Sequence, residues 1–234
     1  MNETGRYWAV VPAAGIGKRM EAHTPKQYLV LAGVSVIVHT LETLLSHPRI
    51  SGVVVVINPN DEWWDTLHLE SDKPLITTTG GEERCHSVRN GLLALTDWAQ
   101  PDDWVLVHDA ARPCLHRTDL DKLLDTLAAD PVGGLLAMPV RDTMKRSDAH
   151  ERIAATVERQ NLWHALTPQM FRLNRLLAAL QQAEERNLQV TDEASAIEAM
   201  GLQPRLVEGR ADNIKITRPE DMALAEFYLT GENG

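Results

Sequence analysis

The sequence is poor in cysteine and has fewer basic than acidic side chains. Its only two cysteines, Cys85 and Cys114, are too few for a framework of disulfide bonds and lack metal-ligand spacing. Lysine and arginine together number 23 against 33 aspartate and glutamate residues, a net charge of −10. Nucleic-acid binding depends on a basic face that neutralises phosphates, so this balance argues against a nucleic-acid partner. Small anionic ligands stay compatible with it, because a few cations in a cleft set the local field.

Long hydrophobic runs are also missing. The longest apolar stretches, such as 52–57 and 133–140, are far shorter than the roughly 20 residues that a membrane-spanning helix needs. The first seven residues contain no basic segment followed by an apolar run, as a secretory signal would. We therefore expect a cytoplasmic protein that does not cross a membrane.

Short apolar runs alternate with segments of helical spacing through most of the chain. The runs rich in Val, Ile and Leu are 8–12, 53–57, 75–78, 104–107 and 135–140. Apolar residues at helical spacing mark 37–47, 83–98 and 120–129. This alternation predicts an α/β fold with a mostly parallel sheet flanked by helices. Ligands bind such sheets outside the carboxyl ends of the strands, so functional residues should follow directly after the apolar runs.

The segment 141–159 interrupts this pattern because it is polar and charged, with a short apolar alternation only near its end. We interpret it as a hairpin-like β-arm that protrudes from the main sheet, with an irregular surface loop as the alternative. The length fits one domain, 1–234, that carries this arm. After the arm, helical spacing marks 173–186 and 192–200, short strands are predicted at 206–207 and 214–216, and a last helix follows Thr217.

A glycine-rich turn, PAAGIGKRM, ends the first predicted strand. Its small residues let the backbone approach a ligand, and Lys18 and Arg19 follow at once, so backbone N–H groups and two cations can cradle an anion. The P-loop pattern fails because Pro12 and Arg19 occupy its glycine and Ser/Thr positions, and the dinucleotide fingerprint fails because Met20 replaces its third small residue. An ordinary strand-to-helix turn is the alternative.

Two further segments carry donors for an anion. Lys26 follows Pro25, which stiffens the loop and suits a lysine that points back at phosphate. The segment 80–87, GGEERCHS, joins a strand to a helix, and its paired glycines again allow close approach while Arg84 and Ser87 add donors. Its alternative interpretation is a helix start whose two glutamates merely favour the helix dipole.

The strand 104–107 leads into the sequence HDAARP. Mg²⁺ usually takes one or two carboxylates together with substrate phosphates, so Asp109 is the predicted metal ligand. The competing interpretation is an ion pair between Asp109 and Arg112 that fixes the loop. We interpret His108 as a structural histidine, because no second His or Cys stands at zinc-ligand spacing on this loop.

Near the end of the chain, the sequence RADNIKIT offers a second carboxylate, Asp212, and a cation, Lys215. Either side chain could be an ordinary surface charge.

These segments together resemble one family. The motifs PAAGIGKRM, PKQ, GGEER with Ser87, VHDAARP, RDTMKR, VERQNLWHALTPQ, TDEASA and RADNIKIT occur in the order typical of 2-C-methyl-D-erythritol 4-phosphate cytidylyltransferases and span about 10–227. The first motif with PK is shared by many nucleotidyltransferases, whereas VHDAARP, LWHALTPQ and DNIKIT are more specific.

The resemblance implies a Rossmann-like enzyme that transfers CMP from CTP to methylerythritol phosphate and releases pyrophosphate, in the non-mevalonate route to isoprenoid precursors. It also implies a Mg²⁺ cofactor and a homodimer with interlocked arms. A nucleotidyltransferase for another acceptor, such as a sugar phosphate, and a non-catalytic nucleotide sensor are the alternatives.

The resemblance assigns roles to individual residues. Arg19 and Lys26 match residues that stabilise the transition state, and Asp109 matches the magnesium aspartate. Apart from the resemblance, the second carboxylate, Asp212, is a further candidate metal ligand. Residues that match the acceptor site are Thr143 and Arg159 on the arm, which reach the partner's site, and Lys215. Residues that match CTP contacts are Ala13, Ala14, Gly15, Gly81, Glu82, Ser87 and Ala110.

Overall fold

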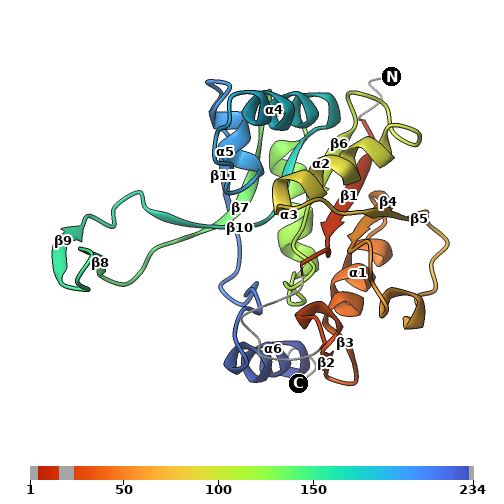
Figure 1. Ribbon diagram of the computed structural model, residues 1–234, viewed down its shortest axis with the longest axis horizontal. Coiled ribbons are helices and arrows are strands. Elements are labelled where there is room, and N and C mark those ends of the chain that lie inside the picture. The colour runs from red at the N-terminus through yellow and green to blue at the C-terminus, as the bar shows by residue number, and fades with distance from the viewer. Residues whose placement is uncertain (1–4, 16–23, 232–234) are drawn as a thin grey trace.

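The computed structural model describes residues 5–15 and 24–231, and its centre is a seven-stranded sheet (Figure 1). One half is parallel, in the spatial order β5-β4-β1-β6, and its strands are β1 (Tyr7–Pro12), β4 (Ile50–Ile57), β5 (Leu75–Thr79) and β6 (Trp104–Val107). In the other half only β10 runs antiparallel to the rest, and its strands are β7 (Gly133–Pro139), β10 (Trp163–Arg172) and β11 (Arg205–Glu208). The predicted α/β fold with a mostly parallel sheet is confirmed.

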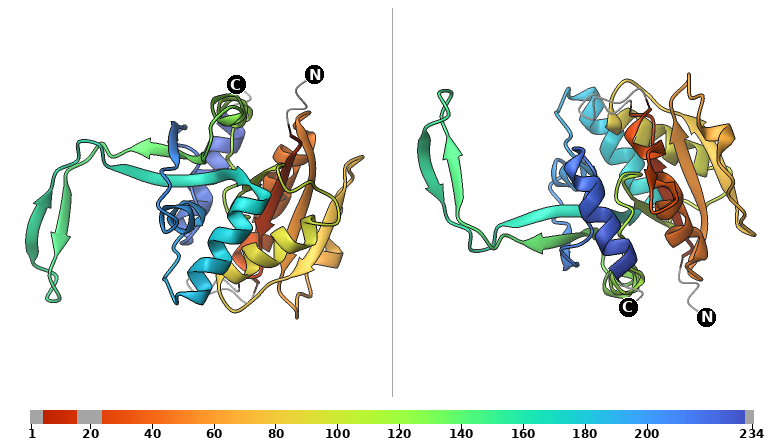
Figure 2. Two further views of the ribbon diagram at one scale, coloured as in Figure 1. Left: turned by 90° about the horizontal axis from the view of Figure 1, so that it is seen from above. Right: turned by 90° about the horizontal axis from the view of Figure 1, so that it is seen from below.

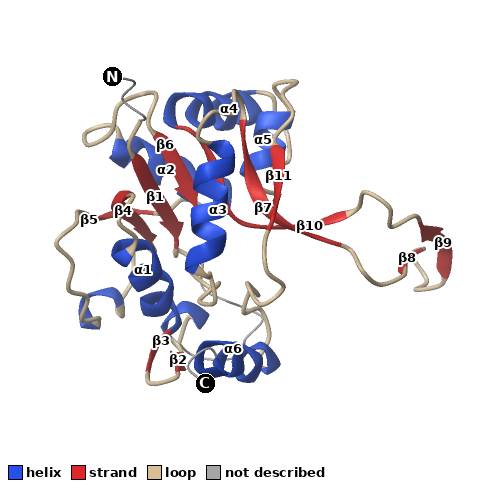
Figure 3. Cartoon of the chain, turned by 180° about the vertical axis from the view of Figure 1, so that it is seen from behind, coloured by secondary structure: helices blue, strands red, loops and turns tan. Residues whose placement is uncertain are grey.

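Helices cover both faces of this sheet. One face packs against α1 (Val36–Ser46) and α3 (Arg117–Leu127), which lie in front of the strands in Figure 3. The opposite face packs against α2 (Arg84–Leu95), α4 (Leu173–Glu185) and α5 (Glu193–Glu198). The last helix, α6 (Glu220–Gly231), packs in a separate small cluster with the short strand β2 (Val30–Leu31), which pairs with β3 (Val34–Ser35).

The central strands are apolar on both faces because both faces are covered. In β1, Ala9 and Val11 face the cluster of α1 and α3, while Trp8 and Val10 face the cluster of α2 and α4. The four consecutive valines of β4 are fully buried. This explains why these strands appear in the sequence as continuous apolar runs rather than as alternating patterns.

Strand β10 is the main element that the sequence did not predict. Proline cannot donate to a sheet ladder and normally argues against a central strand. Here Pro168 follows a cis peptide bond within the irregular part of β10, where its register with β7 shifts between Ala165 and Gln169. The strand therefore accommodates the proline at an interruption of the ladder.

The predicted strand at 214–216 is wrong. This segment has no strand conformation, and the N–H of Ile216 donates to the carbonyl of Ala111 at 2.8 Å. The segment is therefore attached to the loop after β6 rather than to a sheet. The predicted strand at 206–207 lies within β11 and is confirmed.

The segment between β7 and β10 contains a two-stranded antiparallel hairpin of β8 (Met144–Ser147) and β9 (Ile153–Val157). Figure 2 shows from above and from below that this hairpin stands away from the helices and the main sheet. It forms a sheet of its own, and most of its side chains are exposed.

None of the described helices combines the length and the apolar character that crossing a bilayer requires.

Gly91, in the middle of α2, packs closely against the sheet. An added Cβ would lie 2.6 Å from Val10 Cγ1 and 2.8 Å from Val56 Cγ2, and both valines are fully buried and stiff at χ1. We expect Gly91→Ala to lower the free energy of unfolding by about 1–2 kcal/mol, because overpacking costs about 1–3 kcal/mol and better helix propensity returns at most about 1. Urea denaturation measures this change. A midpoint at or above that of the wild type would contradict it, and Leu93→Gln, at a half-exposed position of α2, is the control.

Candidate active site

The carboxyl ends of β1, β5 and β6 meet at one edge of the sheet and hold three loops together. Backbone N–H groups of Ala13, Gly80 and His108 donate to carbonyls of the neighbouring strands β4 and β1 at 2.8–2.9 Å. The strand order runs outward from β1 through β4 to β5 and then returns to β6 on the other side of β1. Such a change of direction is where open α/β sheets bind ligands.

A cleft opens at this point. Ten of the fourteen site residues predicted from the sequence line it, namely Ala13, Ala14, Gly15, Lys26, Gly81, Glu82, Ser87, Asp109, Ala110 and Lys215. The rest of the lining comes from residues outside that predicted set, which are Pro12, Gln27, Glu83, Arg84 and Ala111. Arg19 lies outside the described residues.

Gln27 fixes the described part of the first loop. Its side-chain amide is buried and donates to the carbonyls of Ala13 at 2.7 Å and Gly15 at 3.1 Å. Both bonds attach loop carbonyls to a buried side chain and so fix the backbone at Ala13 and Gly15. The neighbouring Lys26 lines the cleft, and its ammonium group donates to the carbonyl of Ile216 at 3.0 Å.

The second loop is closed by Ser87. Its hydroxyl accepts from the N–H of Gly81 at 3.1 Å and donates to the carbonyl of Glu83 at 3.2 Å. Glycine is required at position 80, because an added Cβ would lie 2.3 Å from the Cβ of Ala14. The loop and the β1 turn are thus in direct contact, with the positive N-terminal end of α2 beside them.

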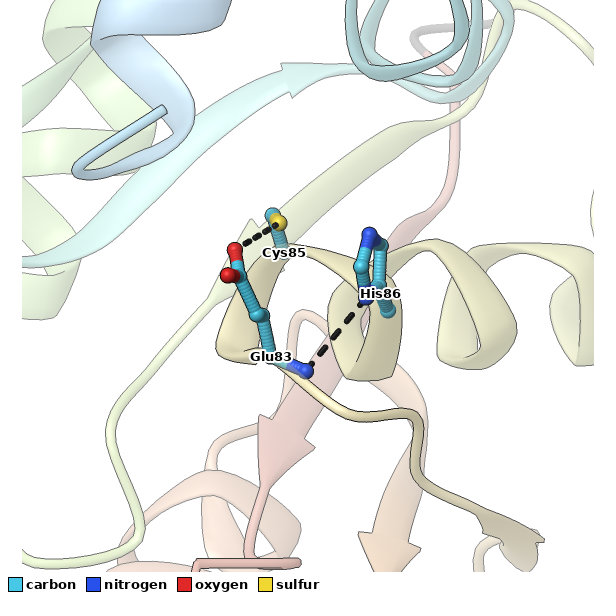
Figure 4. A group of neighbouring side chains, drawn as sticks. All are labelled: Glu83, Cys85 and His86. Carbon is cyan, nitrogen blue, oxygen red and sulfur yellow. Dashed lines mark hydrogen bonds between the residues drawn. The ribbon is translucent and has the colours of Figure 1, made fainter. Parts of the chain in front are cut away.

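A capping box fixes the start of α2. Figure 4 shows the three side chains at this turn, in which the N–H of Glu83 donates to His86 Nδ1 at 3.3 Å. Cys85 Sγ lies 3.7 Å from a carboxylate oxygen of Glu83 (Figure 4). One potential metal-ligand atom from each of Glu83, Cys85 and His86 lies within 4.8 Å of the other two. The capping bonds account for this arrangement.

Asp109 is the charged centre of the cleft. Its Oδ1 lies 3.2 Å from Arg84 Nε, and its Oδ2 lies 2.9 Å from Lys215 Nζ and 3.3 Å from Arg112 Nε. Burial by itself would raise the pKa of this carboxyl group, but the surrounding cations Arg84, Lys215 and Arg112 hold the pKa well below its usual range. Asp109 is therefore a carboxylate throughout the physiological pH range.

Arg84 links Asp109 to a second carboxylate. Its two terminal nitrogens donate to Glu193 Oε1 at 2.6 Å and to Oε2 at 3.2 Å. Glu193 lies on the first turn of α5 and its side chain is only 1% exposed. Sequence reasoning assigned no role to this glutamate, because an acidic residue at a helix start is ordinary and its partner is 109 positions away.

Buried hydrogen bonds between His108, Thr167 and the backbone fix the loop after β6. His108 Nε2 lies 3.1 Å from the carbonyl of Arg112, so this nitrogen carries the proton and Nδ1 accepts from the Thr167 hydroxyl at 2.8 Å. The same hydroxyl accepts from the N–H of Asp109 at 3.1 Å. Burial lowers the pKa of His108 to about 4, so the ring is neutral at pH 7. The interpretation of His108 as a structural residue agrees with this geometry.

Three predicted residues do not line the cleft. Thr143 and Arg159 belong to the arm, where both are exposed and the guanidinium group of Arg159 donates to the carbonyl of Arg141. Asp212 accepts from Arg210 Nε at 3.1 Å with one oxygen and at 2.9 Å with the other. Their predicted roles need contacts beyond those of this single chain.

Comparisons with known proteins agree on one family. The family model described as 2-C-methyl-D-erythritol 4-phosphate cytidylyltransferase matches residues 7–231. A protein of that name from Pseudomonas putida is 58% identical over 217 residues, which are 92% of each chain. Another, from Photorhabdus laumondii, is 56% identical over 228 residues, with 95% of this chain and 94% of the relative covered.

Solved structures give the same result. The crystal structure of the enzyme of that name from Francisella tularensis superposes with a TM-score of 0.83 at 36% identity, covering 95% of this chain and 99% of the other. The enzyme from Thermus thermophilus has a TM-score of 0.75 at 28% identity, covering 93% and 96%.

The low pKa of His108 predicts how stability depends on pH. Between the ordinary histidine pKa of about 6.5 and the folded value of about 4, the unfolded chain binds a proton at this position that the folded chain does not bind. The free energy of unfolding should therefore fall as the pH falls through this window, by as much as about 3 kcal/mol from this group. Below pH 4 the contribution of His108 stops changing.

Denaturant titrations between pH 7 and 4 on the ligand-free protein measure this slope. His108→Asn should flatten the slope, whatever its effect on stability at pH 7. His150→Asn, at an exposed position between β8 and β9, is the matched control and should keep the wild-type slope. Equal slopes for the two variants would show that His108 is not the group responsible.

Proposed function

Because the chain belongs to the 2-C-methyl-D-erythritol 4-phosphate cytidylyltransferase family, we propose that its cleft at the ends of β1, β5 and β6 is where CMP is transferred. The enzyme transfers CMP from CTP to 2-C-methyl-D-erythritol 4-phosphate in the isoprenoid precursor pathway. The products are pyrophosphate and 4-diphosphocytidyl-2-C-methyl-D-erythritol. The observation that carries the placement is the meeting of two lysines, glycine-rich loops and the ionised Asp109 at one sheet edge.

The chemistry requires positive charge more than it requires a base. A phosphate oxygen of the acceptor attacks the α-phosphorus of CTP in line, and negative charge grows on the leaving pyrophosphate. The attacking phosphate is already an anion near neutral pH, so no side chain needs to remove a proton. We assign Lys26 and Arg19 to the charge that develops in the transition state. Lys215, whose side chain is 36% exposed beside Asp109, is assigned to the acceptor phosphate.

The nucleotide is assigned to the loops after β1, β5 and β6. Small side chains and glycines there let backbone N–H groups reach phosphate and base, as on other phosphate-binding loops. Ser87 acts indirectly, because its hydroxyl holds the N–H of Gly81 in place. The residues assigned to CTP are Ala13, Ala14, Gly15, Gly81, Glu82, Ser87 and Ala110.

The donor set fits a magnesium ion. Asp109 Oδ1 has a single short contact among the described residues, to Arg84, so a carboxylate lone pair is available to a cation. Mg²⁺ is usually held by one or two carboxylates and completed by substrate phosphates, so Asp109 is proposed as its ligand. Asp212 is the second proposed ligand, and its carboxylate is bonded to Arg210 in the free chain. When bound, the ion would neutralise charge on the phosphate oxygens.

The arm supports a homodimeric enzyme. A two-stranded hairpin alone is at best marginally stable in water. In this hairpin the apolar residue Ile153 is 69% exposed to solvent. It also stands away from the main sheet and the helices of its own chain (Figure 2). We propose that the arm enters the cleft of a second copy, where Thr143 and Arg159 contact the acceptor.

Cys85 and Cys114 are both thiols, which is consistent with the proposed cytoplasmic location.

Loss of Lys26 tests the proposed cleft directly. Lys26→Ala should lower turnover about a hundredfold, or about 3 kcal/mol, which is typical of losing one preorganised charge-stabilising donor. Pyrophosphate release from CTP, Mg²⁺ and 2-C-methyl-D-erythritol 4-phosphate measures it. Lys122→Ala, on the exposed side of α3, is the control and should keep wild-type turnover. Wild-type turnover in Lys26→Ala would refute the placement of the reaction in this cleft.

Heterodimers with differently tagged subunits test whether the arm acts on its partner. If one subunit carries Lys26→Ala and the other Arg159→Ala, one cleft has both an intact lysine and an intact arm, so about half of the wild-type activity should remain. If both substitutions are on one subunit and its partner is wild type, both clefts are damaged and activity should be lost. Arms that act within their own chain would give the reverse pattern.

A further inference from the structure

Glu193 is a buried carboxylate that has no role in the reaction as proposed. Its side chain is 1% exposed, and both of its oxygens accept from the terminal nitrogens of Arg84. Glu193 lies on α5, and Gln169 of β10 holds the start of this helix. The side-chain N–H of Gln169 donates to Asp192 at 2.9 Å, and the side-chain oxygen of Gln169 accepts from the N–H of Ala194 at 2.8 Å. Glu193 is therefore placed rigidly by its two sequence neighbours.

Stability is a weak explanation for this ion pair. Removing two charges from water is expensive, and well-packed apolar residues often replace a buried ion pair without loss of stability. Burial raises the pKa of Glu193, but the two-point contact with the Arg84 guanidinium group opposes this and favours the carboxylate form. The third donor of the same guanidinium group, Arg84 Nε, reaches Asp109 Oδ1 at 3.2 Å. The pair is thus continuous with the charged centre of the cleft.

The charges around Asp109 do not balance without Glu193. Arg84, Arg112 and Lys215 contribute three positive charges within 3.3 Å of the Asp109 carboxylate, which contributes one negative charge. Among the described residues, Glu193 is the second carboxylate in contact with this group. The five side chains carry a net charge of 3 − 2 = +1, and without Glu193 the net charge would be 3 − 1 = +2.

This difference in net charge affects metal-free CTP and the complex of CTP with a divalent cation in opposite ways. A divalent cation cancels part of the negative charge of CTP, so an additional positive charge in the cleft attracts metal-free CTP more than its metal complex. The same positive charge also repels a cation near Asp109. Raising the net charge of these five side chains from +1 to +2 would therefore favour the form of CTP that lacks the metal.

We propose that Glu193 is a positioning residue that holds Arg84 against Asp109 and sets the charge of the cleft so that CTP binds together with its divalent cation. This inference rests on the proposed function of the cleft. It assigns Glu193 no contact with substrate, since Glu193 is not among the residues that line the cleft and reaches it only through Arg84, which is.

Calorimetric CTP binding with EDTA and with excess Mg²⁺ tests the inference without turnover. For each variant, the magnesium gain is the dissociation constant in EDTA divided by that in Mg²⁺. Glu193→Gln keeps the size of the side chain and removes its charge, so it should bind metal-free CTP at least as tightly as the wild type. Its magnesium gain should fall on the order of tenfold, the size expected from one unit charge in a partly screened site. Glu198→Gln, an exposed change of the same type on the same helix, should leave both values unchanged.

A double variant separates charge from packing. Arg84→Gln with Glu193→Gln has the net charge 2 − 1 = +1 of the wild type and leaves no buried charge without its partner. Its magnesium gain should return to the wild-type value, while its kcat for CMP transfer should lie below that of the wild type because Arg84 no longer orients Asp109. This variant also serves if Glu193→Gln alone does not fold.

The possible results separate the inference from the function beneath it. Equal weakening of CTP binding in EDTA and in Mg²⁺ by Glu193→Gln would mean that the residue is merely structural and would overturn the inference. An altered magnesium gain in the double variant would overturn it as well. A wild-type protein that bound no CTP under either condition would instead contradict the proposed function.

Discussion

The pairing of one buried carboxylate with three cations is the interaction on which the cleft depends. Asp109 lies at the end of β6, yet its partners come from the start of α2, from its own loop and from the segment before α6. Without this carboxylate, Arg84, Arg112 and Lys215 would repel one another in a poorly solvated space. Asp109 therefore organises three parts of the chain that have no sheet pairing with one another. A site prepared for a polyanion needs such a counter-charge before the substrate arrives.

The mixed sheet explains how these distant segments converge. The parallel half, β5-β4-β1-β6, brings the loops after β1, β5 and β6 to one edge by its connectivity alone. The antiparallel β10 then lies beside β6 and supplies Thr167, whose hydroxyl supports the N–H of Asp109. The carbonyl of Thr167 accepts from the amide of Asn213 at 2.8 Å, which attaches the segment that carries Lys215. One irregular strand thus connects the loop after β6, which carries Asp109, to the segment that carries Lys215.

The sequence predicted the parts of the cleft that depend on local pattern. Apolar runs followed by glycine, lysine or aspartate indicate strand ends, and this placed Ala13, Gly81 and Asp109 correctly. It did not reveal groups whose meaning depends on a distant partner. Glu193 has the features of an ordinary helix start until Arg84 is seen beside it. The strand β10 was missed because a proline interrupts it. The segment 214–216 was assigned to a strand because its apolar residues alternate, but in the structure this segment contacts the loop after β6.

The location of acceptor recognition follows from this division of the chain. One fold can host many functions, so the β5-β4-β1-β6 half cannot by itself choose the acceptor. Lys215 comes from beyond β11, and Thr143 and Arg159 come from an arm that its own chain leaves unsupported. In the proposed dimer, the arm is stabilised by the same contact that completes the partner's cleft. A subunit without a partner would then retain the charged cleft centred on Asp109 but lack two of the three residues proposed to hold the acceptor, so assembly and acceptor specificity would depend on the same surface.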